Sequence, residues 1–297
     1  MNMSSITPTA EDIIHKLRPQ AQDIKPIEEG MVNQVFVVDG EVFRFPREAG
    51  GKQRLLYEAE TIVRLAGKIS LDIPELIEVA PDGSYIILSF VVGEVLSDKE
   101  IMAFNPAQKK LLAKTIIQFL RELNATFSIE EVKQLVKVHV PWQKPEDEFY
   151  QSILSRNPKS KYHKLYTSYY EKYVQRQKKV GRVQGIVVRR DFHSGNMIFN
   201  DRNELAGTID FGDVNIGNIV TQLGQCYRLG SDIVEYMISE LGDEFGVADI
   251  ESIKLHAVAH EAWVLMRTEG KEPPRDGRNK LAKKLLSQWL GQNWGEL

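Results

Sequence analysis

The sequence predicts an α+β fold of two lobes, in which a small antiparallel sheet with one main helix precedes a larger and mostly helical lobe. Three observations support this prediction. Short runs of β-branched and aromatic residues recur through the first ninety residues. The spacing of apolar residues becomes helical after Gly93. The length of 297 residues exceeds that of a usual single core and favours two lobes that meet at a cleft.

The first lobe is expected to span residues 1–92 and to begin with a short helix. That helix should start at residues 7–8, because a capping threonine and a proline are followed there by two acids. A hairpin should follow, with strands at 35–38 and 42–45 around the Asp-Gly turn at 39–40.

The remainder of this lobe should contain one long helix and two more strands. An amphipathic helix is expected over residues 55–65, where apolar residues recur with helical spacing. Strands are expected at 76–79 and 85–88, on either side of the Pro-Asp-Gly turn signal at 81–83. The boundary between the lobes should then lie near residues 89–94.

The second lobe is expected to span residues 93–297 and to be mostly helical. A helix should begin at Asn105 and Pro106, because its apolar residues share one face. Residues 222–297 are also mostly helical in pattern, with a loop at 272–277. This order of elements gives the α+β architecture.

Charge and composition exclude several classes of protein. The net charge of −3 and the pI near 6.1 provide no basic field for nucleic acid or for an anionic membrane. Cys226 is the only cysteine, which excludes an internal disulfide. Neither a signal peptide nor an apolar run of about 20 residues is present. We therefore expect a cytoplasmic monomer with no nucleic-acid or membrane partner.

The chemical centre is predicted between residues 186 and 213. An apolar strand at 186–188 is followed by Asp191 and Asn196, and a hairpin with a loop at 200–204 follows. Folding this hairpin about its loop centre places Asn196 opposite Asp210, with Cβ atoms about 5 Å apart. One amide oxygen and one carboxylate would then converge.

Oxygen ligands of this kind suit Mg²⁺, which takes only one or two protein ligands and completes its shell with phosphates and water. We therefore predict a magnesium–nucleotide site at Asn196 and Asp210. Asp191, on the preceding loop, would accept the proton of an attacking hydroxyl group in a phosphoryl transfer. Positioning and charge neutralisation supply most of what such a reaction needs.

The same residues resemble the aminoglycoside phosphotransferase family of the protein-kinase-like superfamily. The resemblance rests on Asp191, His193, Gly195 and Asn196, then on Ile209-Asp210-Phe211-Gly212-Asp213 after the hairpin. It implies a protein-kinase-like fold, ATP or GTP as donor, Mg²⁺ as cofactor and transfer of the γ-phosphoryl group to an aminoglycoside, which confers antibiotic resistance. In detail the chain most resembles enzymes that phosphorylate the 2″-hydroxyl group.

The resemblance also implies a nucleotide site in the first lobe. Residues 27–36 resemble the family's nucleotide-covering loop, and Arg44 occupies the place of the phosphate-binding lysine of kinases, with Glu58 as its helix partner. The linker at residues 89–91 corresponds to the segment that holds the base. The implied nucleotide-binding residues are Gly30, Asn33, Arg44, Glu58, Ser89 and Val91.

Four positions depart from the family's pattern. Arg189 and Arg190 precede Asp191, where the family has histidine followed by glycine or asparagine. Two arginines should favour the ionised form of Asp191 and weaken it as a base, or should instead bind phosphate. Asn124 replaces a histidine, and Gln222 replaces an aspartate. The sequence leaves open whether these changes preserve full activity.

A cationic acceptor would require an acidic pocket in the helical lobe. The candidates are Asp213, Asp232, Glu235 and Glu261, with Trp263 as a surface for stacking or cation–π contact. Asp232 and Glu235 are three residues apart and would share one helical face. The alternative is that these acids face solvent, as acids on helices usually do.

Two other functions remain open from the sequence. One keeps the fold and changes the acceptor to a macrolide, a sugar amine, choline or a homoserine-like alcohol. The other is a nucleotide-binding module with weak or no catalysis, which the residues at 124, 189 and 190 suggest. Protein-kinase activity is disfavoured because no Ala-Pro-Glu segment follows Gly212. The acceptor hydroxyl and the preference between ATP and GTP are not encoded in any motif.

Overall fold

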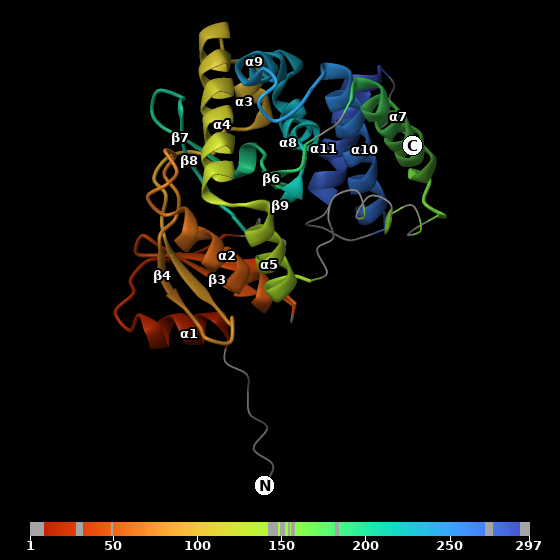
Figure 1. Cartoon of the computed structure of the whole chain (residues 1–297). Coiled ribbons are helices and arrows are strands. Elements are labelled where there is room, and N and C mark those ends of the chain that lie inside the picture. Colours follow the sequence, from red (N-terminus) through yellow and green to blue (C-terminus); the bar gives the residue numbers. More distant parts are fainter. Residues whose placement is uncertain are drawn as a thin grey trace.

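The structure is a computed structural model that combines one antiparallel sheet with a larger set of helices (Figure 1). It describes residues 9–27, 32–48, 50–141, 158–181, 184–270 and 276–291, together with residues 148, 152, 153 and 155. The five-stranded sheet and the mostly helical remainder confirm the predicted α+β fold class.

The sheet has the strand order β1-β2-β3-β5-β4 and is antiparallel throughout. Its strands are β1 (Ile24–Ile27), β2 (Asn33–Val38), β3 (Glu41–Pro46), β4 (Leu76–Val79) and β5 (Ile86–Ser89). Asp39 and Gly40 join β2 to β3 with φ of 48° and 85°, as a tight hairpin turn requires. The predicted hairpin is therefore confirmed, whereas β1 was not predicted as a separate strand.

One helix covers each face of this sheet. Ile14 of α1 (Ala10–Leu17) packs in a small core with Phe36, Phe43 and Phe45. Side chains alternate along a strand, so Arg44 of β3 points to the opposite face, where α2 (Gly51–Leu65) lies. Thr9 caps α1 in place of the predicted start at residues 7–8, which lie outside the described residues.

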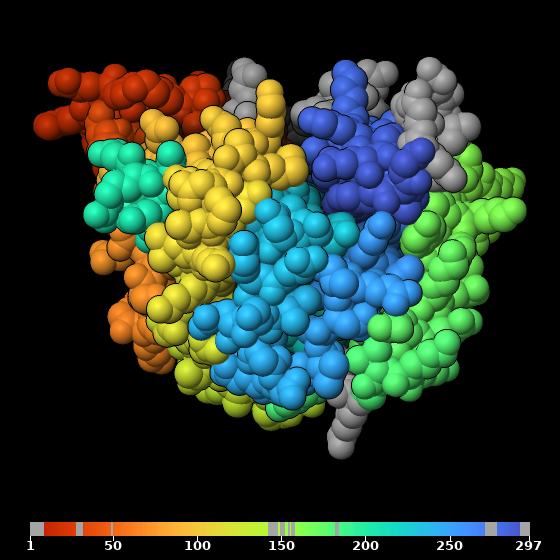
Figure 2. All heavy atoms as spheres, turned by 90° about the horizontal axis from the view of Figure 1, so that it is seen from above, coloured from red at the N-terminus to blue at the C-terminus, as the bar shows by residue number. Residues whose placement is uncertain are grey.

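The remaining helices build the second part of the chain. They are α3 (Asp98–Met102), α4 (Pro106–Thr126), α5 (Ile129–His139), α7 (His163–Val180), α8 (Ile219–Cys226), α9 (Ser231–Leu241), α10 (Ile250–Thr268) and α11 (Asp276–Leu290). Asn105 caps α4 and Pro106 opens it, as predicted. Helix α10 packs against α7, α8 and α11, and α4 packs against α9; Figure 2 shows α4, α9 and α7 across one face. Within the described ranges no helix is long and apolar enough to cross a membrane.

Two short antiparallel pairs hold the predicted chemical centre. Strand β6 (Ile186–Arg189) pairs with β9 (Val214–Gly217), and β7 (Met197–Phe199) pairs with β8 (Leu205–Thr208). The chain passes from β6 to β7 and later from β8 to β9. The two connecting loops, residues 190–196 and 209–213, therefore meet beside each other.

The chain reaches this hairpin directly after the large sheet. Glu94 bridges to Phe199 through two backbone hydrogen bonds of 2.9 and 2.8 Å. Gly93 has φ of 141°, and a Cβ there would lie 2.5 Å from Ile198 and 2.6 Å from the Phe199 carbonyl oxygen. Only glycine fits this close approach between the segment after β5 and the β7–β8 hairpin.

Candidate active site

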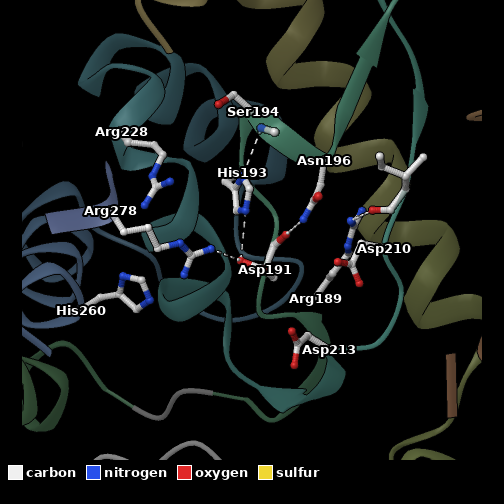
Figure 3. A network of polar contacts seen from close by, with 12 residues as sticks. Arg189, Asp191, His193, Ser194, Asn196, Asp210, Asp213, Arg228, His260 and Arg278 are labelled. Carbon is white, nitrogen blue, oxygen red and sulfur yellow. Dashed lines mark hydrogen bonds and ion pairs between the residues drawn. The ribbon is translucent and has the colours of Figure 1, made fainter. Parts of the chain in front are cut away.

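Asp191 stands on the loop after β6 and is held by its neighbour His193 (Figure 3). The Gly195 N–H donates to Nδ1 of His193 at 3.0 Å. Nδ1 is therefore the acceptor, and Nε2 carries the proton that faces Asp191 Oδ1 at 3.2 Å. The loop thus fixes the imidazole, and the imidazole fixes the carboxylate.

The charges around Asp191 keep it ionised. Burial raises the pKa of this carboxyl group, but the hydrogen bond from His193, followed by the charges of Arg278 and Arg189, outweighs burial and lowers the pKa well below its usual value. The sequence predicted a lowered pKa of Asp191 from Arg189 and Arg190, whereas the largest lowering of this pKa comes from His193. Asp191 is therefore available to accept a hydrogen bond and is a weak base.

The predicted pairing of Asn196 with Asp210 is wrong by one residue. Met197 pairs with Thr208, and the Ile209 N–H donates to the Asn196 carbonyl at 3.1 Å, so Asn196 lies opposite Ile209. A register irregularity between Ile198 and Phe199 makes the hairpin asymmetric, which folding about the loop centre did not anticipate. Asp210 follows with φ of 68°, a left-handed conformation that turns the chain back toward the site.

The side chains of Asn196 and Asp210 both present oxygen atoms that could bind a cation. Asn196 Nδ2 donates to the Asp191 carbonyl oxygen at 2.8 Å, which fixes the orientation of the amide and leaves its oxygen able to bind a ligand. Asp210 offers a carboxylate whose side chain is 35% exposed. Over the described part of the chain, no group of three or more His, Cys, Asp or Glu residues is placed to hold a metal ion. The donor set fits Mg²⁺ that also binds phosphate oxygens.

Arg44 lies between Glu58 and Asp210. Its guanidinium is paired with Glu58 of α2, and Nη2 lies 3.6 Å from Asp210 Oδ2. Glu58 also accepts a hydrogen bond of 3.2 Å from the Phe211 N–H. The large sheet, α2 and the loop after β8 are thus joined by one largely buried polar network.

Glu58 makes stability depend on pH. Burial raises its pKa from 4.5 to about 7, because the Arg44 guanidinium and the Phe211 N–H offset only part of the burial. The folded state therefore holds this proton more tightly than the unfolded chain. Protonation of Glu58 therefore stabilises the folded state. This contribution to the free energy of unfolding is complete below pH 4.5 and is lost as the pH rises to about 7.

Glu58→Gln should remove this dependence, because glutamine resembles the protonated acid. We expect the free energy of unfolding of the wild type, measured by urea titration relative to Glu58→Gln, to fall by about 3 kcal/mol over this pH range. Glu130→Gln, on the exposed face of α5, is the control and should change stability by less than about 0.5 kcal/mol. A difference between wild type and Glu58→Gln that stays constant with pH would contradict the buried position of Glu58.

Arg189 does not bind phosphate, which corrects one of the two roles that the sequence left open for it. Its side chain is fully buried and donates to Thr208 Oγ1 and to the Ile209 carbonyl. The guanidinium also lies 5.2 Å from the ring centre of Phe192 and 4.9 Å from that of Phe211. It therefore supports the backbone just before Asp210.

The other two departures support the same strand. Asn124 Oδ1 accepts from the Val187 N–H and Asn124 Nδ2 donates to the Val187 carbonyl, both at 2.9 Å. Gln222 Oε1 accepts from the Arg189 N–H at 2.8 Å. The backbone N–H of Arg190 donates to the Asp213 carbonyl at 3.1 Å. These contacts hold β6 and the start of the Asp191 loop in place.

The predicted nucleotide-binding residues of the first lobe are only partly described. Gly30 lies outside the described residues. Asn33, at the start of β2, is 5% exposed, and its Oδ1 has no hydrogen-bond partner among the described residues. Ser89 Oγ accepts from the Glu75 N–H at 2.8 Å, and Val91 packs beside Gly207 of the hairpin.

Three of the four acids predicted for a cationic acceptor are ion-paired with basic residues of the chain. Asp213 is paired with Arg54, Asp232 with Lys109 at 2.6 Å, and Glu261 with Arg228 at 2.9 Å. Glu235 is exposed on α9. Trp263 of α10 lies beside the imidazole of His260 and under Arg267. Three of the four acids are thus already neutralised by cations of the chain.

Sequence reasoning missed three arginines near the centre. Arg54 pairs with Asp213. Arg278 Nη2 lies 3.8 Å from Asp191 Oδ1, and Arg228 lies on the same side of the site in Figure 3. Arg54 comes from α2, Arg228 from the 3₁₀ turn at Tyr227–Leu229, and Arg278 from α11. No motif contains them, so only the fold reveals their proximity.

Comparison with known proteins identifies similar chains. A family model described as a phosphotransferase enzyme family matches residues 23–256. A solved GDP complex of wild-type aminoglycoside 2′-phosphotransferase-IIIa has a TM-score of 0.74 and 19% identity, over 96% of this chain and 97% of that chain. A streptomycin–ATP–APH(2″)-IIa ternary complex has a TM-score of 0.67 and 17% identity, over 97% and 98%.

A macrolide 2′-phosphotransferase type I structure is also similar, with a TM-score of 0.66 and 13% identity over 95% of this chain and 98% of that chain. No curated protein sequence matches the chain. At these identities the structural matches show a shared fold. The family match rests on the sequence itself and covers most of the chain.

Proposed function

Because the chain belongs to the phosphotransferase enzyme family, we propose that it transfers the γ-phosphoryl group of ATP or GTP to a hydroxyl group of a small molecule. The observation that carries this proposal is the convergence of Asp191, Asn196 and Asp210 from two adjacent loops. A base and two oxygen ligands at one point are what metal-assisted phosphoryl transfer requires.

Each residue of the centre has a distinct role in the proposed reaction. Asn196 and Asp210 would hold Mg²⁺, which supplies charge neutralisation of the donor phosphates when it is bound. Asp191 accepts the hydrogen bond of the acceptor hydroxyl group and takes its proton as the oxygen–phosphorus bond forms. The bond from the γ-phosphorus to the bridging oxygen breaks, and the nucleoside diphosphate leaves.

Arg44 and the first-lobe residues would bind the donor. Arg44 already faces Asp210 at 3.6 Å, and Glu58 holds its guanidinium in that direction. Asn33 brings a buried oxygen without a described partner to the end of the nucleotide-covering loop. Gly30, Ser89 and Val91 complete the proposed nucleotide site. GDP is bound in one similar structure and ATP in another, so both donors require testing.

An aminoglycoside is the first acceptor to test, since similar structures contain kanamycin and streptomycin. Phosphorylation of such an antibiotic would confer resistance. One observation favours a second candidate, another small alcohol: the carboxylates proposed for a polycation are paired with Arg54, Lys109 and Arg228 instead. A donor–acceptor matrix, read by product mass, compares aminoglycosides, macrolides and other alcohols with ATP and GTP. Product from an aminoglycoside supports the first candidate, and product from other alcohols alone rejects it.

Asp210→Asn tests whether Asp210 binds the metal ion. We expect the variant to weaken magnesium-dependent nucleotide binding by at least about 100-fold, because a charged ligand of the metal is lost. Isothermal titration calorimetry with the donor, in the presence of Mg²⁺ and of EDTA, measures this change. Asp243→Asn, on the exposed turn after α9, is the matched control. Unchanged binding by Asp210→Asn would reject Asp210 as the metal ligand.

A further inference from the structure

Arg278 of α11 faces the proposed catalytic carboxylate from the side that the metal site leaves open. Its Nη2 atom lies 3.8 Å from Asp191 Oδ1, and the two side chains are 38% and 32% exposed. Figure 3 shows Arg278 on one side of Asp191, and Asn196 and Asp210 on the other. An acceptor whose hydroxyl group reaches Asp191 would therefore meet this guanidinium.

The neighbouring acid on this side cannot bind a cationic acceptor. Glu261 is 4% exposed and is bonded to Arg228 at 2.9 Å and to His260 at 3.5 Å. Burial raises the pKa of Glu261, but the hydrogen bond of His260 and the charge of Arg228 outweigh burial and lower it to about 2. Glu261 is therefore ionised and fully used in balancing Arg228.

The other acids nearby are engaged as well. Asp98 accepts a hydrogen bond from Ser194 Oγ, and Asp213 is paired with Arg54. For Arg278, Asp191 is the only carboxylate within ion-pair distance in the described part of the chain. When an acceptor hydroxyl group takes its place at Asp191, the charge of Arg278 therefore needs another partner.

We propose that the acceptor carries an anionic group, a carboxylate or a phosphate, and that Arg278 binds this group while Asp191 binds the hydroxyl group to be phosphorylated. The proposal rests on the proposed phosphotransfer and replaces a polycationic acceptor. A guanidinium offers two parallel N–H donors to such an anion. An acceptor amine at the same place would face the like charge of Arg278.

The geometry also limits the distance between the two groups of the acceptor. Hydrogen bonds to Asp191 and to Arg278 are each about 3 Å long, and the two groups lie 3.8 Å apart. The hydroxyl group and the anion should therefore be within about 10 Å of each other. A single sugar ring with one charged substituent meets this limit.

Four pyranoses that differ only at C6 test the proposal: D-glucose, 6-amino-6-deoxy-D-glucose, D-glucuronate and D-glucose 6-phosphate. Calorimetry measures the binding of each to the full-length protein loaded with Mg²⁺ and a non-hydrolysable ATP analogue. We expect one or both anionic sugars to bind at least about tenfold more tightly than glucose, and the amino sugar to bind most weakly. The glucuronate and phosphate arms identify which anion is preferred.

Variants at residue 278 assign the preference to this side chain. Arg278→Gln should reduce the affinity for the anionic sugar at least about tenfold and leave the affinity for glucose within about threefold, and Arg278→Lys should retain part of the preference. Arg202→Gln, at an exposed arginine of the β7–β8 loop, is the matched control. A merely structural role of Arg278 would instead lower the affinity for all four sugars alike.

Equal binding of the four sugars, tighter binding of the amino sugar, or no measurable binding of any overturns the proposal. So does an anion preference that survives Arg278→Gln. Turnover with ATP and GTP, measured across the wider acceptor matrix, is a separate readout. Turnover of neutral or cationic alcohols without anion preference rejects only the proposed acceptor class. Absence of turnover with every acceptor rejects the phosphotransferase function itself.

Discussion

Asp191→Asn should lower kcat for phosphoryl transfer by about 10²- to 10⁴-fold, the range that a general base contributes. Asparagine keeps the shape of the side chain, but it cannot take the proton of the acceptor. Magnesium–nucleotide affinity should change little, because Asn196 and Asp210 supply the metal ligands. Initial rates with the acceptor identified by the matrix, together with calorimetry for the donor, measure both quantities.

Asp201→Asn is the matched control, since Asp201 is exposed on the β7–β8 loop. It should retain the wild-type rate. The lowered pKa of Asp191 adds a second expectation. The carboxyl group stays ionised at pH values where an ordinary aspartate is already protonated, so its protonation does not limit the rate at mildly acid pH. A rate that survives Asp191→Asn within about tenfold would exclude proton transfer to Asp191.

Arg189→Ala should destabilise the protein by about 3 to 5 kcal/mol, which combines the cavity left by a large buried side chain with two acceptors that lose their donor. The acceptors are Thr208 Oγ1 and the Ile209 carbonyl. Asp210 directly follows in a left-handed conformation, so loss of this support should also lower the affinity for magnesium–nucleotide. Urea unfolding measures the stability.

Arg189→Met tests the two contributions separately. Methionine fills most of the volume but donates no hydrogen bond, so we expect a smaller loss of about 1 to 3 kcal/mol. Arg202→Ala, at an exposed position, should stay within about 0.5 kcal/mol of the wild type. If Arg189→Ala proves as stable as the Arg202→Ala control, then Arg189 does not support the loop.

Local patterns were sufficient to predict the elements that position the site. The Asp-Gly turn at 39–40 fixes the β2–β3 hairpin, and alternation along β3 places Arg44 on the side of α2. The spacing of Asp191, Asn196 and Asp210 around a second hairpin brings their two loops together, and the magnesium–nucleotide site inferred from them stays a prediction. Such information lies within a few residues of the chain and can therefore be inferred from the sequence.

Contacts between distant segments were not predictable in the same way. The register of the β7–β8 hairpin depends on an irregularity that no residue type announces, so the pairing of Asn196 was misplaced by one position. Arg278 meets Asp191 only because α11 packs on α10. Three of the four acids expected to bind an acceptor are paired across elements with basic residues that are far away in the sequence.

The departures from the family's motif have a common structural explanation. Arg189 occupies the position of the usual histidine and is buried as a support, with its backbone held by Gln222. Asn124 holds the adjacent Val187. These residues support the same strand and loop that carry Asp191. These substitutions therefore do not argue for loss of catalysis.

Transfer of label from γ-labelled ATP and GTP to a small-molecule acceptor tests the central claim most directly. Wild type and Asp191→Asn are compared, each with Mg²⁺ and with EDTA. The proposed site predicts labelled product from the wild type with Mg²⁺, none with EDTA, and a rate at least about 100-fold lower for Asp191→Asn. Absence of labelled product with every donor and acceptor, or equal rates for the two proteins, would contradict it.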